Sequence, residues 1–340
     1  MLDPRDTYGP VPQKVTDDEI KLINERLFNF TFKRITYIDG CLRDEFSRAH
    51  NFIYYWPQGK VRMQSSINYF HYTSVENFKN IIRSGVFWAS QLGAMNDPGE
   101  LSYAKEKLLY QVSTLCSPMN IEKNTTSKIN KNISTFFDRY IFKRLFCLSF
   151  SKRGNLSSQW SKYSCENGVS FSLNTQIIKS LSSIYNDVIF TDVIYDQSKQ
   201  LEMLRELAQE ITKDYTLLID EDSAHNLLQK KFEKQLTYIT VAFKHNFYHE
   251  EEEYRVVIPI NGNEMHLKTK PDGVSQYMNI DFMNIYKNNE DIDIPVEYVF
   301  TAPTSNERKA LKNIDSILSN YKIKFGLIIG SGAPFIWPKK

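Results

Sequence analysis

The sequence of 340 residues is poor in cysteine and histidine, with four and six residues respectively. Its cysteines are Cys41, Cys116, Cys147 and Cys165, and no two of them form a Cys-x-x-Cys pair. A zinc ribbon or a disulfide scaffold is therefore not expected. Reduced, mostly buried thiols are expected instead, as in a reducing cytosol.

The sequence also lacks the segments that direct a chain to a membrane. The opening residues, MLDPRDTYGP, contain no basic region followed by an apolar one, and no apolar run approaches the roughly 18 residues that span a bilayer. The net charge is only +2, so no strong field favours nucleic acid or a lipid surface. We therefore expect a cytoplasmic protein with no membrane partner.

Common catalytic and phosphate-binding motifs are missing as well. The sequence has no Gly-x-Ser-x-Gly elbow, no Gly-x-Gly-x-x-Gly fingerprint and no Gly-Lys-Ser/Thr loop. It also has no internal repeat and no coiled-coil heptads. A hydrophobic content of 41% and a charged content of 24% are ordinary for a globular protein, and they allow a sizeable core.

The pattern along the chain predicts an α+β protein. Residues 1–66 are interpreted as an N-terminal helical extension, and residues 67–340 as one domain in which short strands alternate irregularly with helices. This irregularity indicates a curved, mostly antiparallel sheet with inserted helices. The Asp272-Gly273 turn predicts a hairpin, and the polar tract 120–132 is predicted to be an exposed loop or an insertion. Helices are predicted at 74–84, 99–116, 198–215, 222–245 and 305–320.

The first candidate site lies in FHYTSVENFKNIIRSG, where a strand ends and a helix begins. His71, Tyr72 and Thr73 precede Ser74, the expected N-cap, and Gly85 is the expected helix stop. Free amides and the helix dipole make such a junction favourable for an anionic ligand. The alternative is a packed histidine bonded to a backbone carbonyl, which is favoured when this stretch is considered alone.

The second candidate site lies in SFSKRGNLSSQWSKYS, residues 149–164. Ser149 and Ser151 lead into a polar turn, and Trp160 and Tyr163 follow with a spacing that places both on one face of a short helix. An aromatic ring there could stack on a planar heterocycle. The alternative is that both rings anchor the helix to the sheet, and this alternative is favoured for Trp160.

The third candidate site is the run of glutamates in HEEEEYRVVI. Strand alternation places Glu251, Glu253 and Arg255 on one face. Two carboxylates and an arginine facing the same way could orient a sugar and stabilise developing positive charge. The alternative is a solvated acidic junction between a helix and a strand.

His245 and His249 have the i, i+4 spacing that zinc ligands show on a continuous helix. Together with the glutamate run they leave a metal-dependent nuclease as an alternative function. No His-Glu-x-x-His motif or second His/Cys cluster accompanies them, so no bound metal is expected.

Taken together, several blocks resemble a widespread bacterial family, domain-of-unknown-function family 2971. The blocks are FHYTSVENFKNIIRSGVFWAS, MNDPGE, CLSFSKRGNLSSQWSKYSCENGVSFSL and FKHNFYHEEEEYRVVI. The resemblance covers roughly residues 67–260 and, more weakly, 296–335. It implies family membership but does not by itself imply a function.

The order of the blocks also resembles the H-Y-E branch of the ADP-ribosyltransferase fold. This resemblance implies an ADP-ribosyltransferase-like split sheet over residues 67–340, with a helical insertion at about 197–245. It further implies NAD as the substrate. His71 would hold a ribose hydroxyl, Tyr163 would stack on nicotinamide, and Glu253 or Glu251 would oppose the charge of the transition state. The remaining residues assigned to NAD binding are Tyr72, Thr73, Ser149, Ser151, Trp160 and Arg255.

One departure concerns Tyr72, because many members of that branch have glycine after the histidine. The resemblance implies an ADP-ribosyltransferase or NAD glycohydrolase, acting as a bacterial toxin or anti-phage defence effector with partner proteins of a defence system. The acceptor is left open among protein, nucleic acid and water. A non-catalytic module that senses a nucleotide or a protein is the alternative from a different class.

Overall fold

The computed structural model describes residues 35–38, 41–44, 54–55, 68–92, 98–117, 121–141, 144–163, 167–185, 187–216, 227–260, 265–270 and 273–332. The chain divides into two compact units. Unit 1 comprises residues 1–87, 150–180 and 281–340, and unit 2 comprises residues 88–149 and 181–280. The residues predicted as one domain, 67–340, are thus shared between both units.

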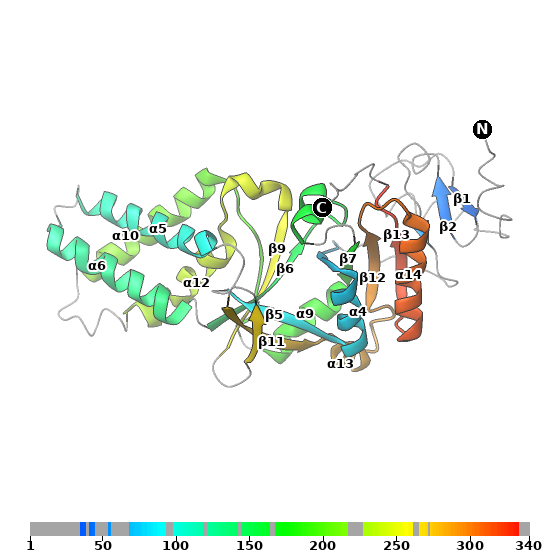
Figure 1. The fold of residues 1–340 in the computed structure, drawn as a ribbon. Helices are drawn as coiled ribbons and strands as arrows, with labels where there is room; N and C mark the ends of the chain where they lie inside the picture. Colours follow the sequence, from blue (N-terminus) through cyan, green and yellow to red (C-terminus); the bar gives the residue numbers. More distant parts are fainter. Residues whose placement is uncertain are drawn as a thin grey trace. The chain divides into compact units, whose positions relative to one another are not determined.

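Unit 1 is built on a largely antiparallel sheet (Figure 1). β12 and β13 form its parallel pair, and β4 pairs antiparallel with β7 so that His71 lies opposite Phe171. The strands follow the order β1 (Ile35–Ile38), β2 (Cys41–Asp44), β3 (Tyr54–Tyr55), β13 (Phe325–Ile329), β12 (Val296–Thr301), β7 (Gly168–Leu173) and β4 (Phe70–Ser74).

Helices cover both faces of β4. α4 (Val75–Ser84) packs Phe78 against Phe171, with ring centroids 5.0 Å apart, on the face to which His71 belongs. α8 (Ser157–Tyr163) packs Trp160 against Tyr72 on the opposite face. The other helices of this unit are α13 (Phe282–Lys287) and α14 (Glu307–Asn320), and α9 (Thr175–Ile184) begins in it.

The predicted ends of the helix after β4 are confirmed. The Ser74 hydroxyl accepts a hydrogen bond from the Asn77 amide at 3.1 Å, and Gly85 adopts a left-handed conformation with φ of 70°. These are the N-cap and C′ features that the sequence indicated. The strand itself begins at Phe70 rather than at the predicted Ile67.

Unit 2 contains a second set of strands. β9 pairs antiparallel with β8, so that Arg255 lies opposite Thr191, and β9 also pairs with β6. β5 lies between β6 and β11 in strand order, and β11 forms the predicted hairpin with β10, although Gly273, predicted as a turn residue, is the first residue of β11 and pairs with Lys270. The strands are β5 (Val86–Gln91), β6 (Leu145–Ser151), β8 (Ile189–Asp192), β9 (Glu253–Pro259), β10 (His266–Lys270) and β11 (Gly273–Asp281). Residues 86–87 of β5, 150–151 of β6 and 281 of β11 belong to unit 1.

A helical cluster completes unit 2 (Figure 1). Its buried core includes Leu108, Ile133, Leu207 and Leu236, which come from four different helices. The elements are α5 (Pro98–Cys116), α6 (Lys123–Phe136), the π-helical turn η2 (Phe137–Ile141), α10 (Gln197–Tyr215), η4 (Leu228–Phe232), α12 (Glu233–Ala242) and the 3₁₀ turn η5 (Asn246–Glu251). No helix in the described ranges is long and apolar enough to cross a membrane.

The prediction of an exposed loop at 120–132 is wrong, because α6 begins at Lys123. Its asparagine, threonine and lysine residues gave no strong helical signal. However, Ile129, Ile133 and Phe136 are fully or almost fully buried in the helical core of unit 2. Burial of this apolar stripe outweighs the weak local propensity.

The predicted helix 222–245 ends earlier, at Ala242. Phe243 forms a parallel bridge with Ile194, which draws the chain into extended structure. The Gln200 side-chain amide fixes this break, because it donates to the backbone oxygens of Ile194 at 2.5 Å and Lys244 at 2.9 Å. The break at Phe243 directs Lys244 toward the glutamate run.

The predicted N-terminal helix lies outside the described residues. Within 1–66, the described elements are β1, β2 and β3, and β3 pairs with β13 of unit 1. The α+β class and the mostly antiparallel sheets with inserted helices are confirmed.

Candidate functional site

The glutamate run turns sharply before it enters β9. η5 ends at Glu251, Glu252 adopts a left-handed conformation with φ of 41°, and β9 begins at Glu253. Glu251 and Glu253 are 8% and 7% exposed, and Arg255 is 1% exposed. The predicted grouping of these three side chains is confirmed, although Glu251 reaches it through a 3₁₀ turn rather than an extended strand.

Lys244 binds both buried carboxylates. Its Nζ donates to Glu251 Oε2 at 2.6 Å and to Glu253 Oε2 at 2.9 Å. Arg255 donates from Nε to Glu253 Oε1 at 2.8 Å and from its second terminal nitrogen to Oε2 at 2.9 Å, and it also binds the Val241 carbonyl. We call Lys244, Glu251, Glu253 and Arg255 the charge cluster, and their formal charges cancel.

Burial and pairing act in opposite directions on the protonation of the charge cluster. Burial favours the neutral amine of Lys244, but the carboxylates of Glu253 and Glu251 outweigh this effect and raise its pKa. Burial lowers the pKa of Arg255 to about 9, so both basic groups stay protonated at neutral pH. Burial raises the pKa of Glu253, while the Lys244 ammonium opposes that rise.

Three further groups of unit 2 border the charge cluster. The Tyr195 hydroxyl accepts the Glu253 backbone amide at 3.1 Å, and a hydrogen bond from Ser149 favours the ionised form of Glu253. Cys147 lies with Sγ 3.6 Å from the Ser149 hydroxyl. Burial, reinforced by the Glu253 carboxylate, raises the pKa of the Cys147 thiol to about 12, so this thiol is not an activated nucleophile.

His71 lies in an aromatic environment of unit 1. Its half-buried ring makes edge-on contacts with Phe87, Phe150 and Phe171, with centroid distances of 4.7, 6.2 and 5.9 Å. Thr73, two residues along β4, is buried. The apolar contacts correspond to the packed histidine that the sequence left as an alternative.

Tyr72 and Trp160 hold the turn between β6 and α8. The Tyr72 hydroxyl donates to the Arg153 carbonyl at 2.7 Å and accepts the Leu156 amide at 2.9 Å, and its ring lies 4.7 Å from that of Trp160. The Trp160 indole donates to the Asn155 side chain at 2.8 Å. Both aromatic residues therefore have a structural anchoring role, which is the role that the sequence favoured for Trp160.

Tyr163 ends α8 with 41% of its surface exposed, and the Lys162 ammonium lies 5.2 Å from its ring centroid. Ser151, before the turn, accepts the Arg153 amide at 3.1 Å. Because neighbouring residues of a strand point to opposite faces, His71 faces away from the side of β4 that α8 covers. Trp160 of α8 packs on the opposite face, against Tyr72, and the convergence of His71 with Tyr163 stays a prediction.

Glu253 belongs to unit 2, so its convergence with His71 and Tyr163 stays a prediction. Sequence reasoning missed Lys244, which binds both carboxylates. The available signal was a single lysine directly after the apolar residues Val241–Phe243, seven and nine residues before the two buried glutamates.

The possible histidine pair does not lie on one continuous helix. His245 has an extended backbone before η5, and its Nδ1 accepts the Phe247 amide at 3.1 Å. His249 contacts the Asn246 carbonyl at 3.0 Å. Among the described residues, no three His, Cys, Asp or Glu side chains are grouped closely enough to hold a metal ion.

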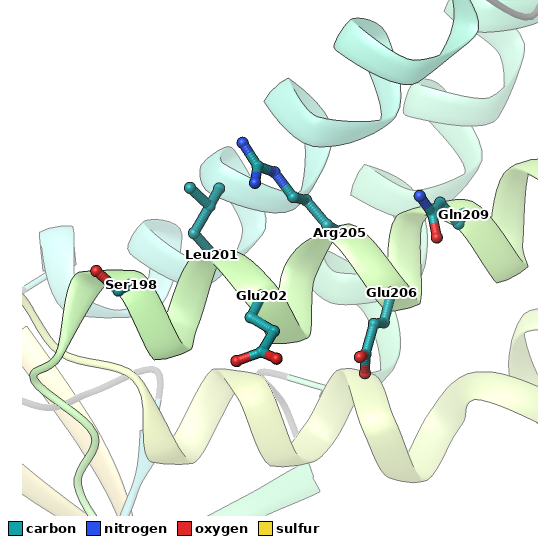
Figure 2. Close-up of a pocket in the computed structure, with 6 residues that line it drawn as sticks. All are labelled: Ser198, Leu201, Glu202, Arg205, Glu206 and Gln209. Atoms are coloured by element: carbon teal, nitrogen blue, oxygen red, sulfur yellow. The ribbon is translucent and has the colours of Figure 1, made fainter.

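A pocket of about 540 Å³ lies along α10 (Figure 2). Figure 2 shows Glu202 and Glu206 on one side of the helix, and Leu201 and Arg205 on the other. None of the residues predicted from the sequence lines this pocket. Its lining residues in the described ranges are Ser198, Leu201, Glu202, Arg205, Glu206 and Gln209.

Comparison with known proteins gives one match. No curated protein and no solved structure matches the chain. One family of proteins matches residues 159–256, a segment that begins just before Trp160 and includes Tyr163 and the whole charge cluster. The block around His71 lies outside this segment. Residues 159–256 are similar to the family described as "Protein of unknown function (DUF2971)", which supports the family resemblance over that part of the chain.

Proposed function

We propose that the chain cleaves the bond between nicotinamide and ribose in NAD and passes the ADP-ribose to an acceptor or to water. The observation that carries this proposal is the pair of buried carboxylates, Glu251 and Glu253, held at the start of β9 by Lys244. The resemblance to the H-Y-E branch supports an ADP-ribosyltransferase-like core and a role as a bacterial toxin or anti-phage effector.

The chemistry requires a fixed negative charge. When the bond from ribose C1′ to the nicotinamide nitrogen breaks, its electron pair leaves with nicotinamide, and positive charge develops on the ribose. A carboxylate oriented in advance, in a site with little water, stabilises this oxocarbenium-like state. The nucleophile then forms the new bond to C1′ and loses its proton.

Glu253 receives the catalytic role because it directly precedes Tyr254 in the Glu-Tyr-x-Val pattern. Lys244 and Arg255 bind both of its oxygens, so its orientation is set without a substrate. Glu251 is the alternative, because Lys244 holds its carboxylate in the same cluster.

The residues of unit 1 enter the proposal through the resemblance. His71 is assigned to a ribose hydroxyl, and Tyr163 to the nicotinamide ring. The exposed ring of Tyr163 suits a stacking role. Tyr72 and Trp160 are assigned to positioning, since their side chains fix the turn before α8.

The test is nicotinamide release from NAD by the purified chain, alone and with single-stranded DNA, RNA or cell lysate. Glu253→Gln should reduce release by about 100-fold or more, the loss typical of removing such a stabilising group. Glu250→Gln is the matched control, because Glu250 is exposed in the same run. Absence of release under every condition contradicts the proposal, and a loss confined to Glu251→Gln transfers the role to that residue.

A second candidate is a non-catalytic module that senses a nucleotide or a protein. It is favoured by the saturation of Glu253, whose two oxygens accept three hydrogen bonds from Lys244 and Arg255 while the side chain is only 8% exposed. Calorimetric binding of NAD without turnover, unchanged in Glu253→Gln, would support this candidate over the enzyme.

A further inference from the structure

Three aromatic rings form a row on one face of the β5, β11 and β10 strands of unit 2. The ring of Trp88 in β5 lies 4.5 Å from that of Tyr277 in β11, with 33° between their planes. The ring of Tyr277 lies 5.4 Å from that of His266 in β10, with 30° between their planes. We call Trp88, Tyr277 and His266 the aromatic row.

The aromatic row faces solvent. Trp88 is 47% exposed, whereas the next residue, Ala89, is completely buried. In β11, Met278 and Ile280 are 1% and 2% exposed, and Tyr277, which alternates with them, is half-buried on the other face. His266 is exposed as well. In β5 and β11, aliphatic side chains therefore point to the interior and the aromatic rings to the other face, whereas in β10 Leu267 is itself 69% exposed.

Packing between strands accounts for part of this arrangement. Tyr277 and His266 are direct partners in the β10–β11 register, and such pairs stabilise a hairpin. The Asn279 side-chain amide donates to His266 Nε2 at 3.1 Å, which fixes the orientation of the imidazole ring. A cross-strand pair does not require a tryptophan, the largest apolar side chain, with nearly half of its surface left in water.

We propose that the aromatic row binds single-stranded nucleic acid, with successive bases stacked on Trp88 and Tyr277. Open sheet faces that carry aromatic rings suit unpaired bases, because every base has a face that can stack. The sequence of the three strands favours an anionic ligand over a cationic one, since it contains two lysines, Lys268 and Lys270, and one acidic residue, Asp281 at the end of β11.

This binding site is independent of the proposed cleavage of NAD. It uses residues outside the charge cluster, and it requires no turnover. A duplex cannot use the aromatic row in the same way, because its base faces are already stacked inside the helix. The proposal therefore predicts a preference for single strands over duplex of the same sequence.

The experiment measures fluorescence anisotropy of a labelled oligonucleotide of about 15 nucleotides, with the full chain, at about 50 mM and about 200 mM salt. Trp88→Leu should weaken binding about tenfold or more, since it keeps an apolar residue but removes the stacking ring. Trp88→Phe should retain most of the affinity. Tyr110→Ala is the matched control, because Tyr110 is an aromatic residue of α5 that is 68% exposed.

Circular dichroism and the thermal midpoint establish that each variant is folded. The expected result is tighter binding of the single strand than of the duplex, with a selective loss in Trp88→Leu. The proposal is overturned if the single strand does not bind at about 50 mM salt, if Trp88→Leu binds like the wild type, or if duplex binds equally well. Failure of NAD cleavage leaves these readouts unchanged, so the two proposals are tested separately.

Discussion

Replacing Lys244 by methionine should strongly destabilise unit 2. The Lys244 side chain is only 4% exposed, and it neutralises two carboxylates whose side chains are 10% and 8% exposed. Methionine fills a similar volume but leaves the remaining three residues with a net charge of −1. Removing one partner from a buried ion pair typically costs about 3–5 kcal/mol, because the other charge stays buried without compensation.

A cost of that size is a large part of the roughly 5–15 kcal/mol that stabilises a typical protein. The matched control is Lys234→Met, because Lys234 is 88% exposed and lies 3.6 Å from Asp187. An exposed ion pair contributes about 0–1 kcal/mol. Two lysines on neighbouring segments of unit 2 should therefore differ severalfold in their effect on the free energy of unfolding.

The assay is urea denaturation followed by circular dichroism, at pH 7 and at about pH 5. The free energy of unfolding lost in Lys244→Met should be smaller at the lower pH, because a buried carboxylate without its cation has a raised pKa and becomes neutral by binding a proton. Adding Glu251→Gln to Lys244→Met should restore more than about 1 kcal/mol, since the charges then cancel again. Equal costs for Lys244→Met and Lys234→Met, or no recovery in the double variant, would refute this reasoning.

Three further perturbations test other parts of the molecule. Burial raises the pKa of Glu297 to about 7, so the folded state holds an extra proton between about pH 4.5 and 7 and loses stability as the pH rises through that range. Glu297→Gln removes this buried charge and should therefore raise the thermal midpoint at pH 8 but not at pH 4.5. Tyr72→Phe removes the acceptor of the Leu156 amide and should cost about 1–3 kcal/mol in urea denaturation. Gly154→Ala would place a Cβ 2.5 Å from a ring carbon of Phe300 and should lower the thermal midpoint, at a cost of about 1–3 kcal/mol.

The sequence predicted elements best where local chemistry determines them. The helix after β4 is an example, because the Ser74 cap and the Gly85 stop act on backbone groups within a few residues. The grouping of Glu251 with Glu253 was also predicted, but from an extended strand, whereas Glu251 actually lies at the end of a 3₁₀ turn. A left-handed non-glycine residue such as Glu252 has no clear sequence signal, since its conformation depends on the surrounding contacts.

Lys244 was missed because its position depends on distant residues. The sequence pattern favoured a helix that continued to residue 245. In such a helix Lys244 would be an ordinary helical residue, and nothing would indicate that it binds the two glutamates. The helix actually ends where Phe243 pairs with Ile194 and where the Gln200 amide binds the chain on both sides. The contacts of Phe243 with Ile194 and of Gln200 with Lys244 span more than 40 residues, so local pattern reasoning has no access to them.

The composition of the charge cluster bears on why it exists at all. Four buried charged side chains are an expensive way to fill an interior, because apolar residues of similar volume often give equal or greater stability. Stability alone therefore does not account for Lys244, Glu251, Glu253 and Arg255. A functional requirement for charge at a fixed position accounts for these four residues. It predicts that replacing the whole charge cluster by apolar residues preserves the fold of unit 2 but abolishes nicotinamide release. If the chain is a sensing module, the same replacement should preserve the fold but abolish ligand binding.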